Sequence, residues 1–296
     1  MSDQETVPDR VLSITGLNVD YRIRSGHVAA VRDAALDIAP GEIVGLVGES
    51  GSGKSTLALA IAGLLPSNAT VVADRFEVAR RHLRLTSAAS DRAAHRALLG
   101  SRIGVVFQDP ASSLDPTMRV GRQIASPVKL HLGLTPGGVR QRVDWLIERT
   151  GLAGVPDIEK RYPHELSGGQ KQRVMIAMSL AAGPALIIAD EPTTALDVTV
   201  QAEILKLLAE LRADLQISCL FVSHDLGVVS QLSDRAVVMR HGVMVEQGPT
   251  ASLLSSPEHP YTRELLACSP RLGRGRGPIS VPVAQDPTAE PGEVAR

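Results

Sequence analysis

The stretch GESGSGKST, which runs from Gly48 to Thr56, decides the fold of this chain. It satisfies the pattern G-x-x-x-x-G-K-[ST], with a short apolar run before it (43–47) and an apolar helical segment after it (57–62). Between a strand and a helix, glycines let the backbone curl around an anion, so that successive N–H groups and the helix dipole converge there. The stretch therefore predicts a phosphate-binding loop rather than a plain Gly/Ser connection.

Two side chains of this loop add chemistry to its backbone. Lys54 is expected to reach the β- and γ-phosphates of a nucleotide, and the Ser55 hydroxyl to ligate Mg²⁺. ATP and Mg²⁺ are therefore the predicted ligands. The residues expected to contact the nucleotide here are Gly48, Ser50, Gly51, Ser52, Gly53, Lys54, Ser55 and Thr56.

The composition limits the architecture and the class of partner. The chain has 296 residues, 44% of them hydrophobic but only 2% aromatic, so its core must consist of Val, Leu, Ile and Ala. Such a core suits a parallel sheet covered by helices. The net charge is −1, whereas binding to nucleic acid normally requires a basic face, so no nucleic-acid partner is predicted.

The cysteines and the apolar runs exclude further classes. Two cysteines, Cys219 and Cys268, offer neither a disulfide framework nor a four-thiolate site, which favours a reducing compartment. The polar start MSDQETVPDR is not expected to be a signal peptide. No apolar run approaches the roughly 20 residues that span a bilayer. A role at a membrane would thus require other chains to hold this one there.

Alternating strands and helices predict an α/β fold, with a mostly parallel sheet, an antiparallel β subdomain and an inserted helical subdomain at about 110–180. The domain limits that we predict are a tail at 1–10, an ATPase domain at 11–255, an extension at 256–270 and a disordered tail at 271–296. Strands are predicted at 11–14, 28–31, 103–107, 185–189 and 218–222, helices at 93–99, 139–150, 170–182 and 198–213, and a hairpin at 237–245.

Two neighbouring carboxylates close the predicted strand at 185–189. A carboxylate at the end of such a strand holds Mg²⁺ in phosphate-loop enzymes, a role that we assign to Asp190. Glu191 is then the candidate general base, which would polarise the water that attacks the γ-phosphorus. The alternative is a pair of solvated acids at a strand end.

A second anion site is predicted where Ser167, Gly168, Gly169 and Gln170 open a helix. A hydroxyl and free N–H groups at a helix start can bind an anion. An ordinary N-cap with flexible glycines explains the same residues equally well. Two anion sites for one ATP make sense if the second faces the nucleotide of a partner chain.

The order of these motifs resembles the ATPase subunits of ABC transporters. The resemblance covers about residues 11–270, and LSGGQ at 166–170 is the most specific of its motifs. It implies an ABC-type phosphate-loop ATPase domain. The motifs are the phosphate loop, Gln108 after a strand, LSGGQ, the strand that ends in Asp190-Glu191, Ala195-Leu196-Asp197, and His224.

The resemblance implies a role for each matching residue. Ser167, Gly168 and Gly169, with Gln170, would bind the γ-phosphate held by the opposite subunit. Simpler interpretations stay open, since Tyr21 can be packing, Gln108 a turn residue and His224 a solvent-facing side chain. The remaining implied roles are adenine stacking for Tyr21, contact with Mg²⁺ and the attacking water for Gln108, organisation of the dimer interface for Asp197, and a hydrogen bond to the γ-phosphate for His224.

Other motifs are similar to the oligopeptide, dipeptide and nickel importers of this family, above all His259-Pro260-Tyr261-Thr262-Arg263. This implies an ATP-hydrolysing subunit for peptide import; nickel or another small solute, or a non-transport soluble ABC ATPase, are the alternatives. The implied partners are a second, different ATPase subunit, two permeases and an extracytoplasmic solute-binding protein, at the cytoplasmic face of the inner membrane. Some members carry a cysteine cluster after this segment, but here only Cys268 follows, so no iron–sulfur cluster is expected.

Overall fold

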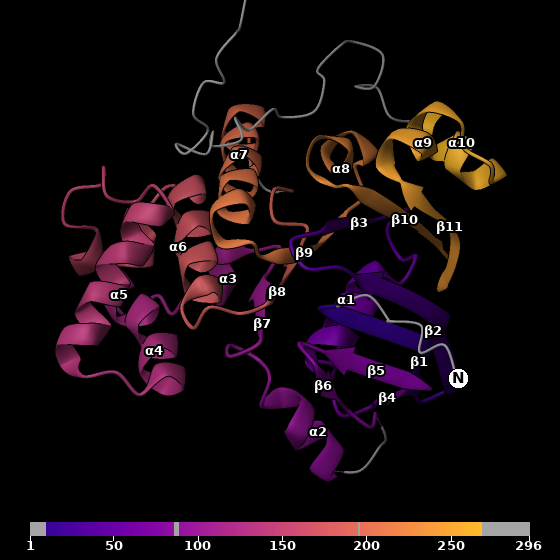
Figure 1. The fold of residues 1–296 in the computed structure, drawn as a ribbon, viewed down its shortest axis with the longest axis horizontal. Helices are drawn as coiled ribbons and strands as arrows, with labels where there is room; N and C mark the ends of the chain where they lie inside the picture. Colours follow the sequence, from indigo (N-terminus) through magenta and orange to yellow (C-terminus); the bar gives the residue numbers. More distant parts are fainter. Residues whose placement is uncertain (1–9, 86–88, 195, 268–296) are drawn as a thin grey trace, which may run out of the picture.

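The computed structural model describes residues 10–85, 89–194 and 196–267. Two sheets lie beside a block of helices, as Figure 1 shows with the sheets at the right and the block at the left. The predicted tail at 271–296, Cys268, Ala195 and most of the predicted N-terminal tail lie outside the described residues.

The central sheet has six strands in the order β11-β10-β3-β9-β8-β7, and every neighbouring pair except β10–β11 is parallel. All residues of β3 and β9 are buried, as the apolar runs predict. Because β3, β9 and β8 are neighbours, the segments that follow them meet at one edge. The strands are β3 (Ile43–Val47), β7 (Ile103–Val106), β8 (Leu186–Asp190), β9 (Ser218–Ser223), β10 (Arg235–Arg240) and β11 (Val243–Pro249).

The second sheet is antiparallel, in the order β2-β1-β5-β6 with β4 also paired to β1. Its buried side chains form a cluster with those of helix α1 (Lys54–Ala62), the helix that follows the phosphate loop. The predicted antiparallel subdomain is thus confirmed. Its strands are β1 (Leu12–Ile23), β2 (Gly26–Ile38), β4 (Ala69–Val72), β5 (Arg75–Val78) and β6 (Arg81–His82).

The helical block falls where the inserted subdomain was predicted. No helix within the described ranges is long and apolar enough to cross a membrane. The block contains α3 (Pro110–Ser113), α4 (Val120–Leu132), α5 (Pro136–Arg149), two 3-10 turns (Ile158–Lys160 and Pro163–Glu165) and α6 (Gly168–Leu180), and the other helices are α2 (Ala89–Arg96), α7 (Val198–Leu215), α8 (Leu226–Leu232), α9 (Thr250–Ser255) and α10 (Pro260–Ala267).

Several predicted limits were wrong by a few residues because local capping was missed. The helix predicted at 93–99 is α2, which ends at Arg96 because the N–H groups of Leu98 and Leu99 bond three residues back and tighten the chain. The helix predicted at 170–182 begins at Gly168, since Ser167 is its N-cap. The strand predicted at 103–107 ends at Val106, which leaves Phe107 outside it.

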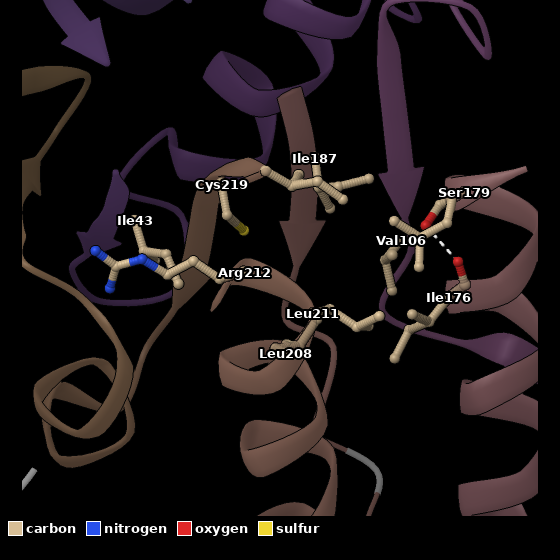
Figure 2. A pocket seen from close by; sticks show the side chains of 11 residues that line it. Ile43, Val106, Ile176, Ser179, Ile187, Leu208, Leu211, Arg212 and Cys219 are labelled. Carbon is tan, nitrogen blue, oxygen red and sulfur yellow. Dashed lines mark hydrogen bonds between the residues drawn. The ribbon is translucent and has the colours of Figure 1, made fainter. Parts of the chain in front are cut away.

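Helix α6 of the block and helix α7 beside it meet the central sheet across an apolar layer. Figure 2 shows Leu208 and Leu211 of α7 and Ile176 of α6 facing Cys219 of β9 around a cavity of about 20 Å³. Burial raises the pKa of the Cys219 thiol to about 12, which makes it a poor metal ligand. The expected absence of an iron–sulfur cluster stays a prediction, because Cys268 lies outside the described residues.

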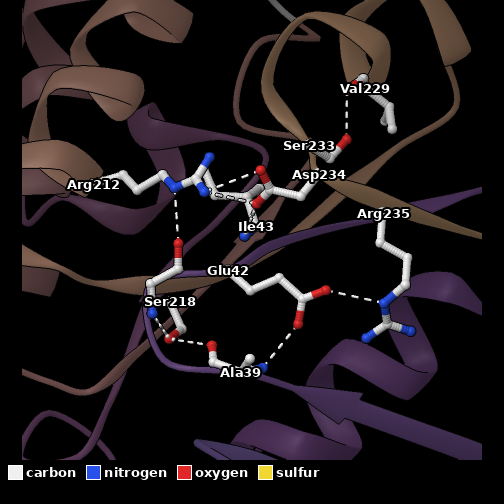
Figure 3. A network of polar contacts seen from close by, with 10 residues as sticks. Ala39, Glu42, Ile43, Arg212, Ser218, Val229, Ser233, Asp234 and Arg235 are labelled. Carbon is white, nitrogen blue, oxygen red and sulfur yellow. Dashed lines mark hydrogen bonds and ion pairs between the residues drawn. The ribbon is translucent and has the colours of Figure 1, made fainter. Parts of the chain in front are cut away.

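A polar network fixes the amino ends of the parallel strands, opposite the phosphate-loop edge (Figure 3). Arg212 of α7 donates from Nε to the Gly41 carbonyl at 2.8 Å and from Nη2 to Asp234 Oδ1 at 3.0 Å. The other oxygen of Asp234 accepts the backbone N–H of Ile43 at 2.9 Å, and Arg235 pairs with Glu42 at 2.9 Å. The strand that carries the phosphate loop is therefore anchored at its start.

Candidate functional site

A cavity of about 700 Å³ opens at the carboxyl edge of the central sheet. Residues from four separate strand ends meet there, because the segments after β3, β9, β8 and β7 follow consecutive strands of the sheet. The predicted catalytic residues Gln108, Glu191 and His224 all line it. The remaining lining residues are Ser50, Gly51, Gly53, Lys54, Ser55 and Thr56 of the phosphate loop, Val28, Ala29, Ala30 and Arg32 of β2, and His241 and Gly242 of the β10–β11 turn.

Two positions of the phosphate loop admit only glycine. At Gly48, with φ 155°, a Cβ would lie 2.1 Å from the Met239 carbonyl oxygen. At Gly53, with φ 103°, it would lie 2.6 Å from the Ala30 carbonyl oxygen. The loop thus packs directly on the backbone of β2 and β10, and its curved path is set by these close approaches.

The Lys54 side chain is buried at the centre of the loop, with 4% of its surface exposed. Its Nζ donates to the carbonyl oxygens of Gly48 and Glu49, each at 2.8 Å. Burial lowers the pKa of the Lys54 ammonium, and the carboxylates of Glu191 and Asp190 oppose that shift. A desolvated cation beside a nest of N–H groups fits a phosphate ligand.

Replacing Lys54 by Ala is expected to weaken ATP binding by roughly 10- to 100-fold, the usual worth of a hydrogen bond to a charged group. Direct titration of the purified protein with ATP measures the effect. Lys206→Ala is the matched control, since Lys206 is exposed on α7 and pairs with Glu210, away from the nucleotide cavity lining. An ATP affinity of Lys54→Ala within twofold of the wild type contradicts this role.

The predicted magnesium ligands Ser55 and Asp190 are adjacent. The Ser55 hydroxyl donates to Asp190 Oδ1 across 3.0 Å. Burial raises the pKa of Asp190, the Ser55 bond lowers it, and the charges of Glu191 and Lys54 act in opposite senses. The described residues contain no group of three or more His, Cys, Asp or Glu side chains suited to a metal. A hydroxyl and one carboxylate nevertheless fit Mg²⁺, which takes its other ligands from waters and phosphates.

The Glu191 carboxylate is the point where the candidate catalytic residues converge. Its Oε2 accepts hydrogen bonds from Gln108 Nε2 at 3.2 Å and from Thr194 Oγ1 at 2.9 Å, and His224 Nδ1 lies 3.2 Å from the same oxygen. The φ of Glu191 is 46°, a left-handed value that non-glycine residues seldom adopt. Such strain is typical of functional sites, and here it turns the carboxylate towards the cavity.

Thr194 was missed in the sequence, although its position three residues after Glu191 was a usable signal. A hydroxyl at that spacing in a turn can reach back to the acid, as it does here. His224 has 52% of its side chain exposed. Its contact with Glu191 requires a hydrogen on Nδ1, so that Nε2 can donate to a phosphate only when the imidazole is protonated.

The residues of LSGGQ are not among those that line this cavity. The Ser167 hydroxyl accepts the N–H of Gln170 at 3.3 Å, and Gln170 Oε1 accepts the N–H of Ser167 at 3.0 Å, so the pair forms a capping box at the start of α6. A Cβ on Gly169 would lie 2.6 Å from Val200, so close helix packing demands glycine there, while Gly168 meets only Leu196, at 3.4 Å. The N-cap interpretation is confirmed, and anion binding stays a prediction.

Two further predicted residues also lie off the cavity lining. Asp197 caps α7, with Oδ1 accepting the N–H groups of Thr199 and Val200 at 3.0 Å each. Tyr21 pairs with Val28 across β1 and β2 and packs, partly buried, against the antiparallel-sheet cluster. Their predicted roles at the dimer interface and on adenine remain predictions.

Comparison with known proteins gives two family matches. The sequence model described as "ABC transporter" matches residues 31–194. The model described as "Oligopeptide/dipeptide transporter, C-terminal region" matches residues 245–292, which include the His-Pro-Tyr-Thr-Arg stretch. The two matches thus cover the phosphate loop through Glu191 and the segment that follows β10.

Named relatives extend over most of the chain. A putative peptide import ATP-binding protein of Brucella ovis is 44% identical over 268 residues, covering 89% of this chain and 78% of the relative. The glutathione import ATP-binding protein GsiA of Salmonella typhimurium is 42% identical over 269 residues, covering 90% of this chain but 43% of the longer relative.

Solved structures share the fold. A dimeric ATP-binding cassette in a post-hydrolysis state, bound to ADP and Pi, superposes with a TM-score of 0.67 at 25% identity, covering 81% of this chain and 98% of that one. The protein cbiO1 from Clostridium perfringens, part of the ABC transporter complex cbiONQ, gives a TM-score of 0.68 at 31% identity and covers 90% and 98%.

Proposed function

The chain belongs to the ABC transporter family of ATPases, and from this premise we propose that it is the motor subunit of an importer for oligopeptides or dipeptides. One observation carries the proposal: the phosphate loop shares its cavity with Gln108, Glu191 and His224, in a chain whose end matches the peptide-transporter C-terminal region. The names of the relatives support peptides as the solute class.

In the proposed mechanism the protein works by positioning and by charge. The loop N–H groups and Lys54 bind the phosphates. Ser55 and Asp190 would hold Mg²⁺, which would supply positive charge beside them. Glu191 accepts the proton of the attacking water, while Gln108 and Thr194 fix the carboxylate. His224 in its protonated form holds Glu191 through Nδ1 and a phosphate oxygen through Nε2.

The functional unit that we propose is a dimer of two different ATPase chains. Two ATPs would lie between the subunits, each bound by the phosphate loop of one and by LSGGQ of the other. The separation of LSGGQ from the cavity within this chain supports that arrangement. The dimeric cassette with ADP and Pi is a relative of the same fold.

A mostly apolar groove of about 660 Å³ is the proposed contact with the permeases. It lies between the end of β7 and helices α4 and α6, and Phe107 in its wall directly precedes Gln108. Leu130 of α4 is 77% exposed there. A partner helix with apolar side chains would bury this surface. Because Phe107 is part of the groove, a displacement of Gln108 would shift the contact with that helix. Through two permeases the chain would be held at the cytoplasmic face of the inner membrane, opposite a solute-binding protein.

Replacing Leu130 by Glu is expected to reduce co-purification of the permeases by about tenfold or more, as loss of a central apolar contact commonly does. ATP affinity should stay unchanged, since Leu130 does not line the cavity that contains the phosphate loop. The matched control is Leu134→Glu, because Leu134 is also exposed, at 43%, but does not line the groove. Equal recovery of permeases with both variants would argue against this docking surface.

The proposed function is tested by uptake in a strain that lacks this gene. Wild-type chain should restore accumulation of labelled dipeptides and oligopeptides, whereas Lys54→Ala should not. Restored nickel uptake without peptide uptake would favour the metal importer instead. Failure of any permease or binding protein to co-purify from solubilised membranes would favour a soluble, non-transport ATPase.

A further inference from the structure

Helix α10 contacts the phosphate loop from the far end of the chain. The hydroxyl of Tyr261 accepts the backbone N–H of Glu49 at 3.0 Å, across 212 positions of sequence. Tyr261 is 1% exposed, so the acceptor is buried, while Glu49 on the donor side is exposed and the bond is partly buried. Tyr261 lies in the segment that matches the peptide-transporter C-terminal region, so this segment contacts the phosphate loop directly.

The bonded N–H belongs to the peptide unit that also carries the Gly48 carbonyl. That carbonyl accepts a hydrogen bond from Lys54 Nζ at 2.8 Å. A peptide unit is planar, so holding one end sets the direction of the other. Tyr261 therefore fixes the orientation of a backbone group that places the phosphate-binding lysine.

The tyrosine is itself held from several sides. The guanidinium of Arg240, at the end of β10, lies 4.5 Å from the centre of its ring. Glu246 of β11 accepts the N–H groups of Glu258 at 2.8 Å and His259 at 3.1 Å, and also the Thr262 hydroxyl. The entry into α10 is thereby tied to the central sheet, which leaves the tyrosine hydroxyl little freedom to move.

The chemistry of the hydroxyl suits a permanent acceptor. Burial raises the pKa of Tyr261, and the bond from Glu49 opposes that shift only in part. The group is thus a neutral phenol at ordinary pH. On another side of the loop, the Gly242 N–H donates to the Ser52 carbonyl at 2.8 Å, so the loop is braced both by the β10–β11 turn and by α10.

We propose that Tyr261 is a positioning residue of the nucleotide site, which sets the affinity for ATP by holding the Gly48–Glu49 peptide in its binding orientation. The proposal rests on the proposed binding of ATP at this loop. Under this proposal the C-terminal segment is part of the nucleotide site. A movement of α10 would change the orientation of the Gly48–Glu49 peptide, and a change in that peptide would alter the position of α10.

Tyr261→Phe tests the proposal, because it removes the hydroxyl and keeps the ring. The expected result is a three- to tenfold rise in the Kd for ATP (about the worth of one neutral hydrogen bond) with a similar acceleration of amide exchange at Glu49. ATP titration and NMR hydrogen exchange without nucleotide measure the two effects. Tyr162→Phe is the matched control, since Tyr162 precedes the second 3-10 turn and does not line the nucleotide cavity.

The outcomes separate this inference from the proposed function. Unchanged ATP affinity in Tyr261→Phe, with a wild type that binds ATP, overturns the inference and leaves the function standing. Unchanged exchange at Glu49 overturns it as well, even if affinity falls, because the loop would then not be what the hydroxyl holds. A wild type that binds no ATP overturns both the inference and the proposed function. In that case, faster amide exchange at Glu49 in Tyr261→Phe would show only that the hydroxyl stabilises the loop structure.

Discussion

Glu191→Gln is expected to leave ATP bound and to slow its hydrolysis by about 10²- to 10⁴-fold, the usual worth of a general base. Glutamine keeps the shape of the side chain but cannot accept a proton from water. Binding should survive because the phosphates contact the loop and Lys54, and Glu191 reaches them only through the attacking water. In the variant, Gln108, Thr194 and His224 contact a side chain that has no basic oxygen.

ATPase rates and ATP affinities, measured on the same purified complex, provide the test. Glu210→Gln is a suitable control, because this exposed glutamate of α7 pairs with Lys206 and does not line the nucleotide cavity. Thr194→Val adds a graded variant: it leaves the base in place but removes one of the donors that orient it, so its loss of rate should be smaller. Turnover of Glu191→Gln within a factor of two of the wild type would end the assignment.

The parts of the fold predicted from sequence are those that local patterns determine. Continuous apolar runs at 43–47 and 218–222 predict buried parallel strands, and both are present in β3 and β9. The phosphate loop is a single continuous segment, so the motif alone predicts a nucleotide ligand and identifies Lys54, with no knowledge of the tertiary structure. Glu191 could be named as a candidate base because it directly follows a strand whose neighbours in the sheet are implied by the α/β pattern, and the structure places it in the lining of the cavity.

The remaining cavity wall was not predictable in this way. The β2 strand contributes Val28 and Arg32 to this wall, and the β10–β11 turn contributes His241. They line the site because the tertiary fold packs both segments against the phosphate loop. His241 and Gly242 were predicted as a turn, which they form, but a turn motif contains no information about what it packs against. The bond from Glu49 to Tyr261 has the same origin, since sequence patterns do not report contacts between distant segments.

LSGGQ shows a different limit of sequence analysis. A helix N-cap and a second anion site use the same hydroxyl and the same free N–H groups, so the residues alone predict both. The structure shows the capping box, with Ser167 and Gln170 bonded to each other. In the dimer that we propose, anion binding at this place would need a nucleotide presented by another chain, and would therefore depend on a surface that one subunit does not contain.

Ser167→Arg is expected to slow hydrolysis of the ATP held by the partner subunit by about 10²-fold or more, while this chain's own affinity for ATP stays unchanged. The arginine side chain would fill the space through which a γ-phosphate approaches α6. It would not alter the cavity at Lys54, because Ser167 does not line it. The isolated chain should accordingly be a poor ATPase, whose rate per subunit rises when the partner ATPase is added.

Ser167→Ala separates the two functions of the serine. Both substitutions remove the capping hydroxyl, which costs about 1 kcal/mol of stability, but only arginine also blocks the approach of a phosphate. If the site acts only as a cap, the two variants should lose stability and activity alike. If the site faces a partner's ATP, Ser167→Arg should reduce the ATPase rate much more than Ser167→Ala, although the two variants lose similar stability. ATPase rate against protein concentration, with and without the partner, distinguishes these cases, and a full-rate monomer that is indifferent to concentration would exclude the shared site.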